Sequence, residues 1–150
     1  MPYRGQCQCG AVSADIIGEP LSVRQCWCHQ CQQVAAGGAT HNAIFETEQV
    51  QLGGELNAHS YVAASGNTLT QSYCGSCGTP VMAQTSARPQ FRAVRLGFLE
   101  PGNGLRPTMA IWTDDAPSWA NIDATLQHYR GQPPSPSPLQ TFGPQIQTLK

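Results

Sequence analysis

The residues in this sequence best suited to chemistry are its seven cysteines, which fall into three short clusters. Cysteines that only fill a core are not expected to gather in this way, whereas metal sites draw their thiolates from closely spaced pairs. The clusters therefore predict metal binding, and zinc is the metal that thiolates commonly hold. The first cluster is Cys7 and Cys9, the second is Cys26, Cys28 and Cys31, and the third is Cys74 and Cys77.

The two outer clusters together supply the four ligands that a closed zinc site needs. In Cys74-Gly75-Ser76-Cys77-Gly78, a two-residue spacer lets both sulfurs face one ion, and the glycines let the backbone turn around it. Cys7 and Cys9 form a half-site of the same kind with a shorter spacer. Joined, the four thiolates would bind a structural zinc, whose role is the stability of the fold.

The central cluster is left with three sulfurs, and three protein ligands with an open position are typical of catalytic zinc. Three thiolates around a dication make a site of net negative charge, which is a weak Lewis acid and activates water poorly. Such a site can still capture a soft ligand, such as a substrate thiol, and hold it as the thiolate that adds to a carbonyl. Cys26, Cys28 and Cys31 are the predicted holders of this catalytic zinc, with substrate or water as the fourth ligand.

The spacing alone leaves alternatives open. Cys74 and Cys77 would also suit a redox dithiol, although the βαβ context of thioredoxin-like motifs is not evident here. The central cluster would be a second structural zinc site if His29 or a distant residue were its fourth ligand. The alternative functions are then a redox dithiol protein or a non-catalytic, zinc-stabilised binding module.

Other polar side chains are less informative. The residue that transfers protons is not fixed by the sequence, and the candidates are His29, Tyr73 and Asp114. Three arginines could bind a carboxylate, but a solvated surface is the simpler interpretation; these are Arg24, Arg92 and Arg95.

Composition limits the partners. The net charge is −1, and the 8 Lys and Arg residues form no basic run, which argues against nucleic acid or an anionic membrane as the main partner. No apolar stretch approaches the roughly 20 residues that span a bilayer, and the first residues lack the apolar core of a signal peptide. We therefore expect a cytoplasmic protein. The chemistry of the central cluster predicts that its partner is a small-molecule thiol, a thiol adduct or a compact electrophile. The sparse charge is also compatible with a homodimer.

Short apolar runs between frequent Gly and Pro turns predict an all-β fold with little helix. The sequence predicts a short helix at 29–36 and one helical turn at 118–123. A hairpin is predicted around Ser65-Gly66-Asn67, with arms at 59–63 and 69–73. The remaining predicted strands are 10–17, 21–25, 40–45, 50–52, 81–85, 91–97 and 108–112.

The chain is long enough for one domain with a buried core, which we place at residues 1–132. The run Pro133-Pro134-Ser135-Pro136-Ser137-Pro138 excludes both a helix and a central strand. Residues 133–150 are therefore predicted to be an extended, Pro-rich C-terminal tail.

The order C-x-C-G, C-x-C-x-x-C, C-x-x-C-G resembles the glutathione-dependent formaldehyde-activating enzyme family, which includes centromere protein V. The resemblance covers about Gly5 to Tyr129. The three-part order of cysteines is a specific signal, and the flanking matches are individually weak. They are GQCQCGAVS, CWCHQCQQVAAGG, SYCGSCGTPV, RLGFLEPG and PTMAIWTDDAPSWANIDATLQHY.

The resemblance implies a β-tent fold of stacked antiparallel sheets with zinc knuckles. It implies two zinc ions per chain, a structural one on Cys7, Cys9, Cys74 and Cys77 and a catalytic one on the central cluster. It also implies a carbon–sulfur lyase activity, run in reverse to condense formaldehyde with glutathione. Fold and zinc transfer between relatives more safely than the substrate does.

Overall fold

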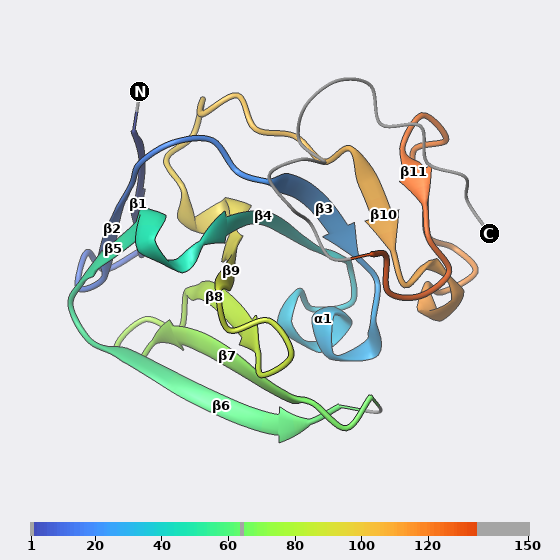
Figure 1. The fold of residues 1–150 in the computed structure, drawn as a ribbon, viewed down its shortest axis with the longest axis horizontal. Coiled ribbons are helices and arrows are strands. Elements are labelled where there is room, and N and C mark those ends of the chain that lie inside the picture. The colour runs from blue at the N-terminus through green and yellow to red at the C-terminus, as the bar shows by residue number, and fades with distance from the viewer. Residues whose placement is uncertain (1, 64, 135–150) are drawn as a thin grey trace. The chain divides into compact units, whose positions relative to one another are not determined.

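A computed structural model describes residues 2–63 and 65–134 of the chain, and these residues are mainly β-strand, as predicted (Figure 1). They form two compact units. Unit 1 contains the described residues up to Pro20 together with Ile44–Gly104. Unit 2 contains Leu21–Ala43 and the described residues from Leu105 on. No helix in this part of the chain is long and apolar enough to cross a membrane.

Unit 1 is built from antiparallel strands. A three-stranded sheet has the order β1-β2-β5, and a second set has the order β9-β8-β7-β6, in which β6 and β7 form the predicted hairpin. The strands are β1 (Tyr3–Gln6), β2 (Ser13–Ile16), β5 (Val50–Gly53), β6 (Leu56–Val62), β7 (Thr68–Cys74), β8 (Pro80–Thr85) and β9 (Phe91–Arg95). Two short 3-10 helices are η1 (Thr47–Gln49) and η2 (Leu96–Phe98).

The sequence did not predict β1, whose residues lack an alternating apolar pattern. The strand forms because its whole length pairs with β2, from Tyr3↔Ile16 to Gln6↔Ser13. Gly5 also lies directly against the ring of Phe98, where a Cβ atom at this position would approach Cδ2 to 2.6 Å. The β1 backbone therefore reaches the core through a glycine, and it ends just before Cys7.

Unit 2 combines parallel strand pairs with a short helix. The strand order is β11-β10-β3, and both pairs are parallel, so this part departs from the predicted all-antiparallel arrangement. Its elements are β3 (Ser22–Cys26), α1 (His29–Val34), β10 (Met109–Ile111), η3 (Thr113–Asp115) and β11 (Gln127–His128). Strand β4 (Thr40–Glu46) passes from unit 2 into unit 1 after Ala43.

Two details of the prediction for unit 2 are corrected. The helical turn predicted at residues 118–123 is wrong, because the 3-10 turn forms at Thr113–Asp115. Strand β11 was not predicted. It is only two residues long and depends on parallel pairing with β10, which a short sequence pattern does not encode. Most of the predicted Pro-rich tail, residues 135–150, lies outside the described residues.

Candidate metal centres

Unit 1 brings together the four cysteines of the two outer clusters. Their sulfur atoms all lie within 4.8 Å of one another. The Sγ atom of Cys9 is 3.7 Å from that of Cys7 and 3.7 Å from that of Cys74. A tetrahedron of thiolates at about 2.3 Å from zinc has edges of about 3.8 Å, so this spacing fits a four-thiolate metal site. All seven cysteines are free thiols.

Turns with left-handed glycines orient these four sulfurs. Cys7 follows β1, and Gly10 (φ 83°) closes a turn in which the N–H of Val12 donates to Cys7 Sγ at 3.2 Å. Cys74 ends β7, and the N–H of Gly78 (φ 79°) donates to its carbonyl oxygen at 2.8 Å. Of the two glycines in residues 74–78, Gly78 takes the left-handed conformation that lets the chain turn beside the sulfurs.

Hydrogen bonds to sulfur favour the thiolate form of Cys77 in this group. Cys77 Sγ lies 3.1 Å from the hydroxyl of Thr79. The hydrogen bonds from that hydroxyl and from the Thr79 backbone are the main causes that lower the pKa of Cys77 to about 5. A hydrogen bond from the backbone N–H of Ala11 lowers the pKa of Cys9, but desolvation and the neighbouring thiols outweigh it and raise the pKa to about 11. The group thus resists full ionisation without a cation.

Unit 2 brings together the three cysteines of the central cluster. The sulfurs of Cys26, Cys28 and Cys31 also lie within 4.8 Å of one another, and no fourth Cys, His, Asp or Glu of the described residues joins them. Cys26 ends β3, and Cys28 is the residue before α1. The N–H of Cys31, inside the helix, approaches Cys28 Sγ at 3.4 Å. The chain passes from β3 into α1 within three residues, and this short connection places the three thiols close together.

The crowding of these thiols has an electrostatic consequence. The hydrogen bonds with Cys28 and then Cys31, followed by burial, raise the pKa of Cys26 far above its usual range. The contact with Cys26 lowers the pKa of Cys28, but the contact with Cys31 and burial outweigh it and raise the pKa to about 11. The thiols therefore hold protons that a dication would displace.

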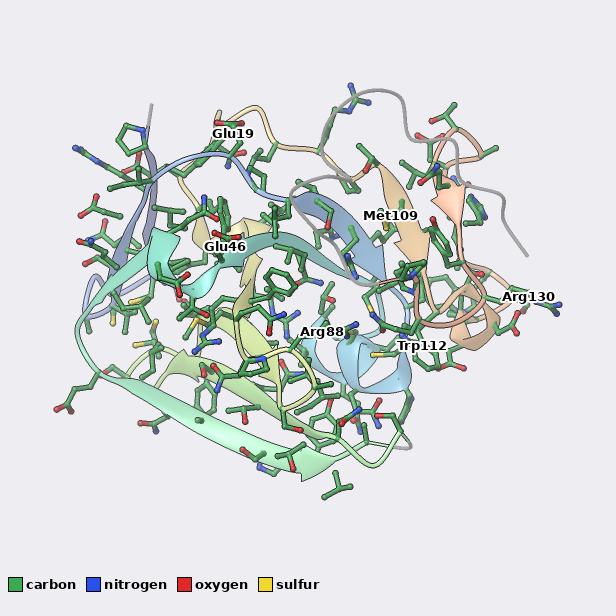
Figure 2. The ribbon with its side chains drawn as sticks, in the orientation of Figure 1. Glu19, Glu46, Arg88, Met109, Trp112 and Arg130 are labelled. Atoms are coloured by element: carbon green, nitrogen blue, oxygen red, sulfur yellow. The ribbon has the colours of Figure 1, made fainter. Side chains whose placement is uncertain are left out.

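Parallel pairing sets the surroundings of the central cluster. Ile111 on β10 pairs with Cys26, and its carbonyl oxygen accepts a hydrogen bond of 3.0 Å from the N–H of Trp27. Cys26, Cys31 and Ile111 form a buried group. The half-buried side chains that pack against this group are Cys28, Met109, Trp112 and Tyr129. Figure 2 labels Met109 and Trp112 among the side chains of this region.

The side-chain amide of Gln32 connects the central cluster to the η3 turn. The side-chain nitrogen of Gln32 donates to the carbonyl oxygen of Trp27 at 2.8 Å and to that of Asp115 at 2.9 Å. It thereby ties the loop between Cys26 and Cys28 to the η3 turn. An amide is suited to this role because its NH₂ group carries two donors.

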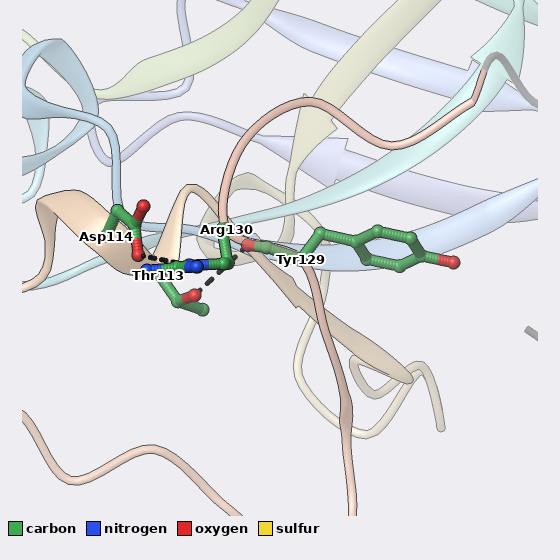
Figure 3. A network of polar contacts seen from close by, with 4 residues as sticks. All are labelled: Thr113, Asp114, Tyr129 and Arg130. Carbon is green, nitrogen blue, oxygen red and sulfur yellow. Dashed lines mark hydrogen bonds and ion pairs between the residues drawn. The ribbon is translucent and has the colours of Figure 1, made fainter. Parts of the chain in front are cut away.

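The candidate proton-transfer residues have other surroundings. His29 begins α1 and is exposed, and it does not belong to the group of three sulfurs. Asp114 is an exposed member of η3 whose carboxylate pairs with Arg130 Nε at 3.0 Å, and the Tyr129 ring points away from that pair (Figure 3). Tyr73 lies on β7 in unit 1, beside Cys74.

The solvated-surface interpretation of the arginines is wrong for two of the three. Arg24 and Arg95 are each only 6% exposed. Arg24 lies on β3 two residues before Cys26 and donates to the hydroxyl of Ser22 at 3.1 Å. Arg95 ends β9 and donates to the side-chain oxygen of Gln71. Arg92 is half-buried and donates to the carbonyl oxygens of Pro89, in the loop before β9, and of Phe91, the first residue of β9.

Four side chains near the central cluster were not predicted as site residues. Met109, Trp112 and Tyr129 reach it through the parallel register of β3, β10 and β11, and Gln32 reaches it through the helix. The sequence gives no signal of this register, because 82 residues separate the end of β3 from the start of β10 along the chain. Only the position of Gln32 next to Cys31 in the sequence indicated that its side chain lies near the central cluster.

The described residues define a mainly β protein with two groups of cysteines that could hold metal ions. The family model described as glutathione-dependent formaldehyde-activating enzyme matches residues 2–115, and the chain belongs to this family. No curated protein matches the chain.

A crystal structure of a Rhodobacter sphaeroides protein is similar, with a TM-score of 0.55 and 23% sequence identity. The match covers 69% of this chain and 97% of that one. At this identity the likeness supports the fold.

Proposed function

We propose that this chain is a zinc-dependent enzyme of the carbon–sulfur lyase type, which forms or releases an adduct between a small thiol and a compact electrophile. Glutathione and formaldehyde are the type of pair that the description of the family suggests. The proposal includes two zinc ions per chain, the predicted β-tent arrangement and a cytoplasmic location.

The observation that supports it most is the difference between the two groups of cysteines. One group has four sulfurs and suits a closed metal site, whereas the other has three sulfurs with no further ligand among the described residues. Zinc held by the three thiolates would keep a substrate thiol in its thiolate form. The donor set suits this ion because thiolates are among its preferred ligands.

The side chains of unit 2 would perform the remaining tasks. Cys26, Cys28 and Cys31 provide the negative charge that keeps the site selective for soft ligands. Gln32 fixes the loop between Cys26 and Cys28, through its bonds to Trp27 and Asp115. Met109, Ile111, Trp112 and Tyr129 cover the sulfurs with apolar surface, which limits the access of water.

Exchange spectroscopy by NMR tests the activity. Zinc-loaded protein is added to ¹³C-formaldehyde with glutathione or with 2-mercaptoethanol, and the exchange rate between free thiol and its hydroxymethyl adduct is measured. We expect the protein to accelerate the exchange for at least one thiol, and the Cys28→Ser variant to lose the effect. The Gln33→Ala variant, which alters an exposed residue of the same helix, is the control.

Two results would contradict the proposal. If the zinc-loaded protein accelerates neither exchange, the family scaffold serves binding or stability here. If reduction and oxidation of the thiols cycle without loss of metal, the chain is a redox dithiol protein.

A further inference from the structure

Trp112 has an unusual backbone conformation beside the central cluster. Its φ of 56° and ψ of 39° lie in the left-handed region, which side chains as bulky as tryptophan rarely adopt. Of the described non-glycine residues, only Trp112 and Ala36 have positive φ. A strained conformation persists only where the surrounding structure enforces it, and such residues gather at functional sites.

Hydrogen bonds on every side hold this conformation. The Trp112 N–H donates to the carbonyl oxygen of Gly131 at 3.2 Å, and the Asp115 N–H donates to the Trp112 carbonyl oxygen at 3.0 Å. The indole N–H donates to the side-chain oxygen of Gln132 at 3.2 Å. The same turn is secured at its other end by the bond from Gln32 to Asp115.

The turn determines where the indole lies. Trp112 directly follows Ile111, which pairs with Cys26, so the reversal of the chain occurs at the level of the three sulfurs. The indole packs against the buried group that contains Cys26 and Cys31. Trp112 remains only half-buried, so the core does not enclose it completely.

We infer that Trp112 is the specificity-determining residue of the three-cysteine site, with its indole forming the wall against which the substituent of a bound thiol packs. This inference rests on the proposed function. It also narrows the substrate class to thiols, or thiol adducts, with flat or apolar surface close to the sulfur. An indole provides a large, rigid surface that prefers aromatic and aliphatic contacts.

The test measures thiol binding to the full-length, cobalt(II)-loaded protein. Two thiols that differ only by a ring, 2-phenylethanethiol and ethanethiol, are titrated while the cobalt–thiolate absorption is followed. The quantity compared is the ratio of the two dissociation constants. Trp112→Asn removes the indole but tolerates left-handed backbone, and Trp112→Gly does so without strain. Trp112→Phe keeps an aromatic ring, and Trp119→Asn alters a tryptophan that is 71% exposed.

We expect wild type to prefer 2-phenylethanethiol, and Trp112→Asn to lose about 2- to 12-fold of that preference, the range for one aromatic pair. Trp112→Phe should keep most of it, and Trp119→Asn all of it. If Trp112→Asn does not load cobalt, the ratio for Trp112→Gly decides. An unchanged ratio in whichever of these two variants binds cobalt would overturn the role of Trp112 and leave the proposed function standing. If wild type binds neither thiol, the specificity role of Trp112 fails, whereas the proposed function is decided by the exchange measurement with glutathione and 2-mercaptoethanol.

Discussion

Replacing Gln32 by glutamate should weaken unit 2 and the metal site that it carries. The two side chains have nearly the same shape, but glutamate replaces the NH₂ donor by a carboxylate oxygen. That oxygen would face the carbonyl oxygens of Trp27 and Asp115, which now lie 2.8 and 2.9 Å from a donor. Two hydrogen bonds would become two repulsive contacts.

The magnitude follows from the two contacts. A typical intramolecular hydrogen bond stabilises a protein by about 0.5–1.5 kcal/mol, so the loss of both costs about 1–3 kcal/mol of the free energy of unfolding. Gln32→Met loses the same bonds without adding charge, and it should show only this cost. The carbonyl oxygens would raise the pKa of a glutamate at this position above its usual value of about 4.3. The destabilisation of Gln32→Glu beyond that of Gln32→Met is therefore fully present above the raised pKa of the glutamate. It shrinks as the pH falls through that raised pKa toward about 4.3.

Urea unfolding at fixed zinc concentration measures the free energies at pH 7.5 and 5.5, and cobalt release to a chelator reports on the metal site. We expect Gln32→Glu to be less stable than Gln32→Met at pH 7.5, with the gap narrowing at pH 5.5. Gln33→Glu makes the same change at an exposed neighbour and should stay within about 0.5 kcal/mol of wild type. Equal stability of wild type and Gln32→Glu at pH 7.5 would refute the stabilising role of the two hydrogen bonds that Gln32 donates.

Three further predictions concern stability. Gly5→Ala should cost about 1–3 kcal/mol in urea unfolding, because its Cβ would overlap the ring of Phe98; an unchanged midpoint would contradict this packing. At Trp112, where φ is 56°, the Gly variant should be about 1–2 kcal/mol more stable than the Ala variant by the same assay, and an Ala variant of equal stability would argue against left-handed backbone. Burial and then the hydrogen bond to Glu19 (2.7 Å) raise the pKa of Tyr3 to about 12, so its contribution is complete below pH 10 and is lost as the pH rises from 10 to 12. Partial exposure limits that contribution to about 1 kcal/mol, and Tyr3→Phe should flatten the alkaline loss seen in thermal melts.

The parts of the fold that depend on local patterns could be predicted. The hairpin of β6 and β7 follows from alternation around a turn sequence, and α1 follows the knuckle and ends where Ala36 and Gly37 take positive φ. The two groups of sulfurs also follow from the spacing and number of the cysteines. Cys7 and Cys74 are far apart in the sequence, and their sulfurs lie in the same group, as predicted. Local chemistry constrains these features strongly.

The parts that depend on distant pairing could not be predicted. Strand β1 is held by β2 and by the contact of Gly5 with Phe98, and none of its own residues indicates this. The apolar cover of the central cluster depends on the register Ile111↔Cys26, which no spacing in the sequence encodes. The burial of Arg24 likewise follows from its place on a covered strand.

Native mass spectrometry of the zinc-loaded chain, with and without a thiol, counts the zinc ions and thiols that each chain holds. We expect two zinc ions and one added thiol per wild-type chain. The Cys28→Ser variant should keep one zinc ion and bind no thiol. Two zinc ions that persist in Cys28→Ser, or a chain that holds both ions and accepts no thiol, would contradict an open three-cysteine zinc site.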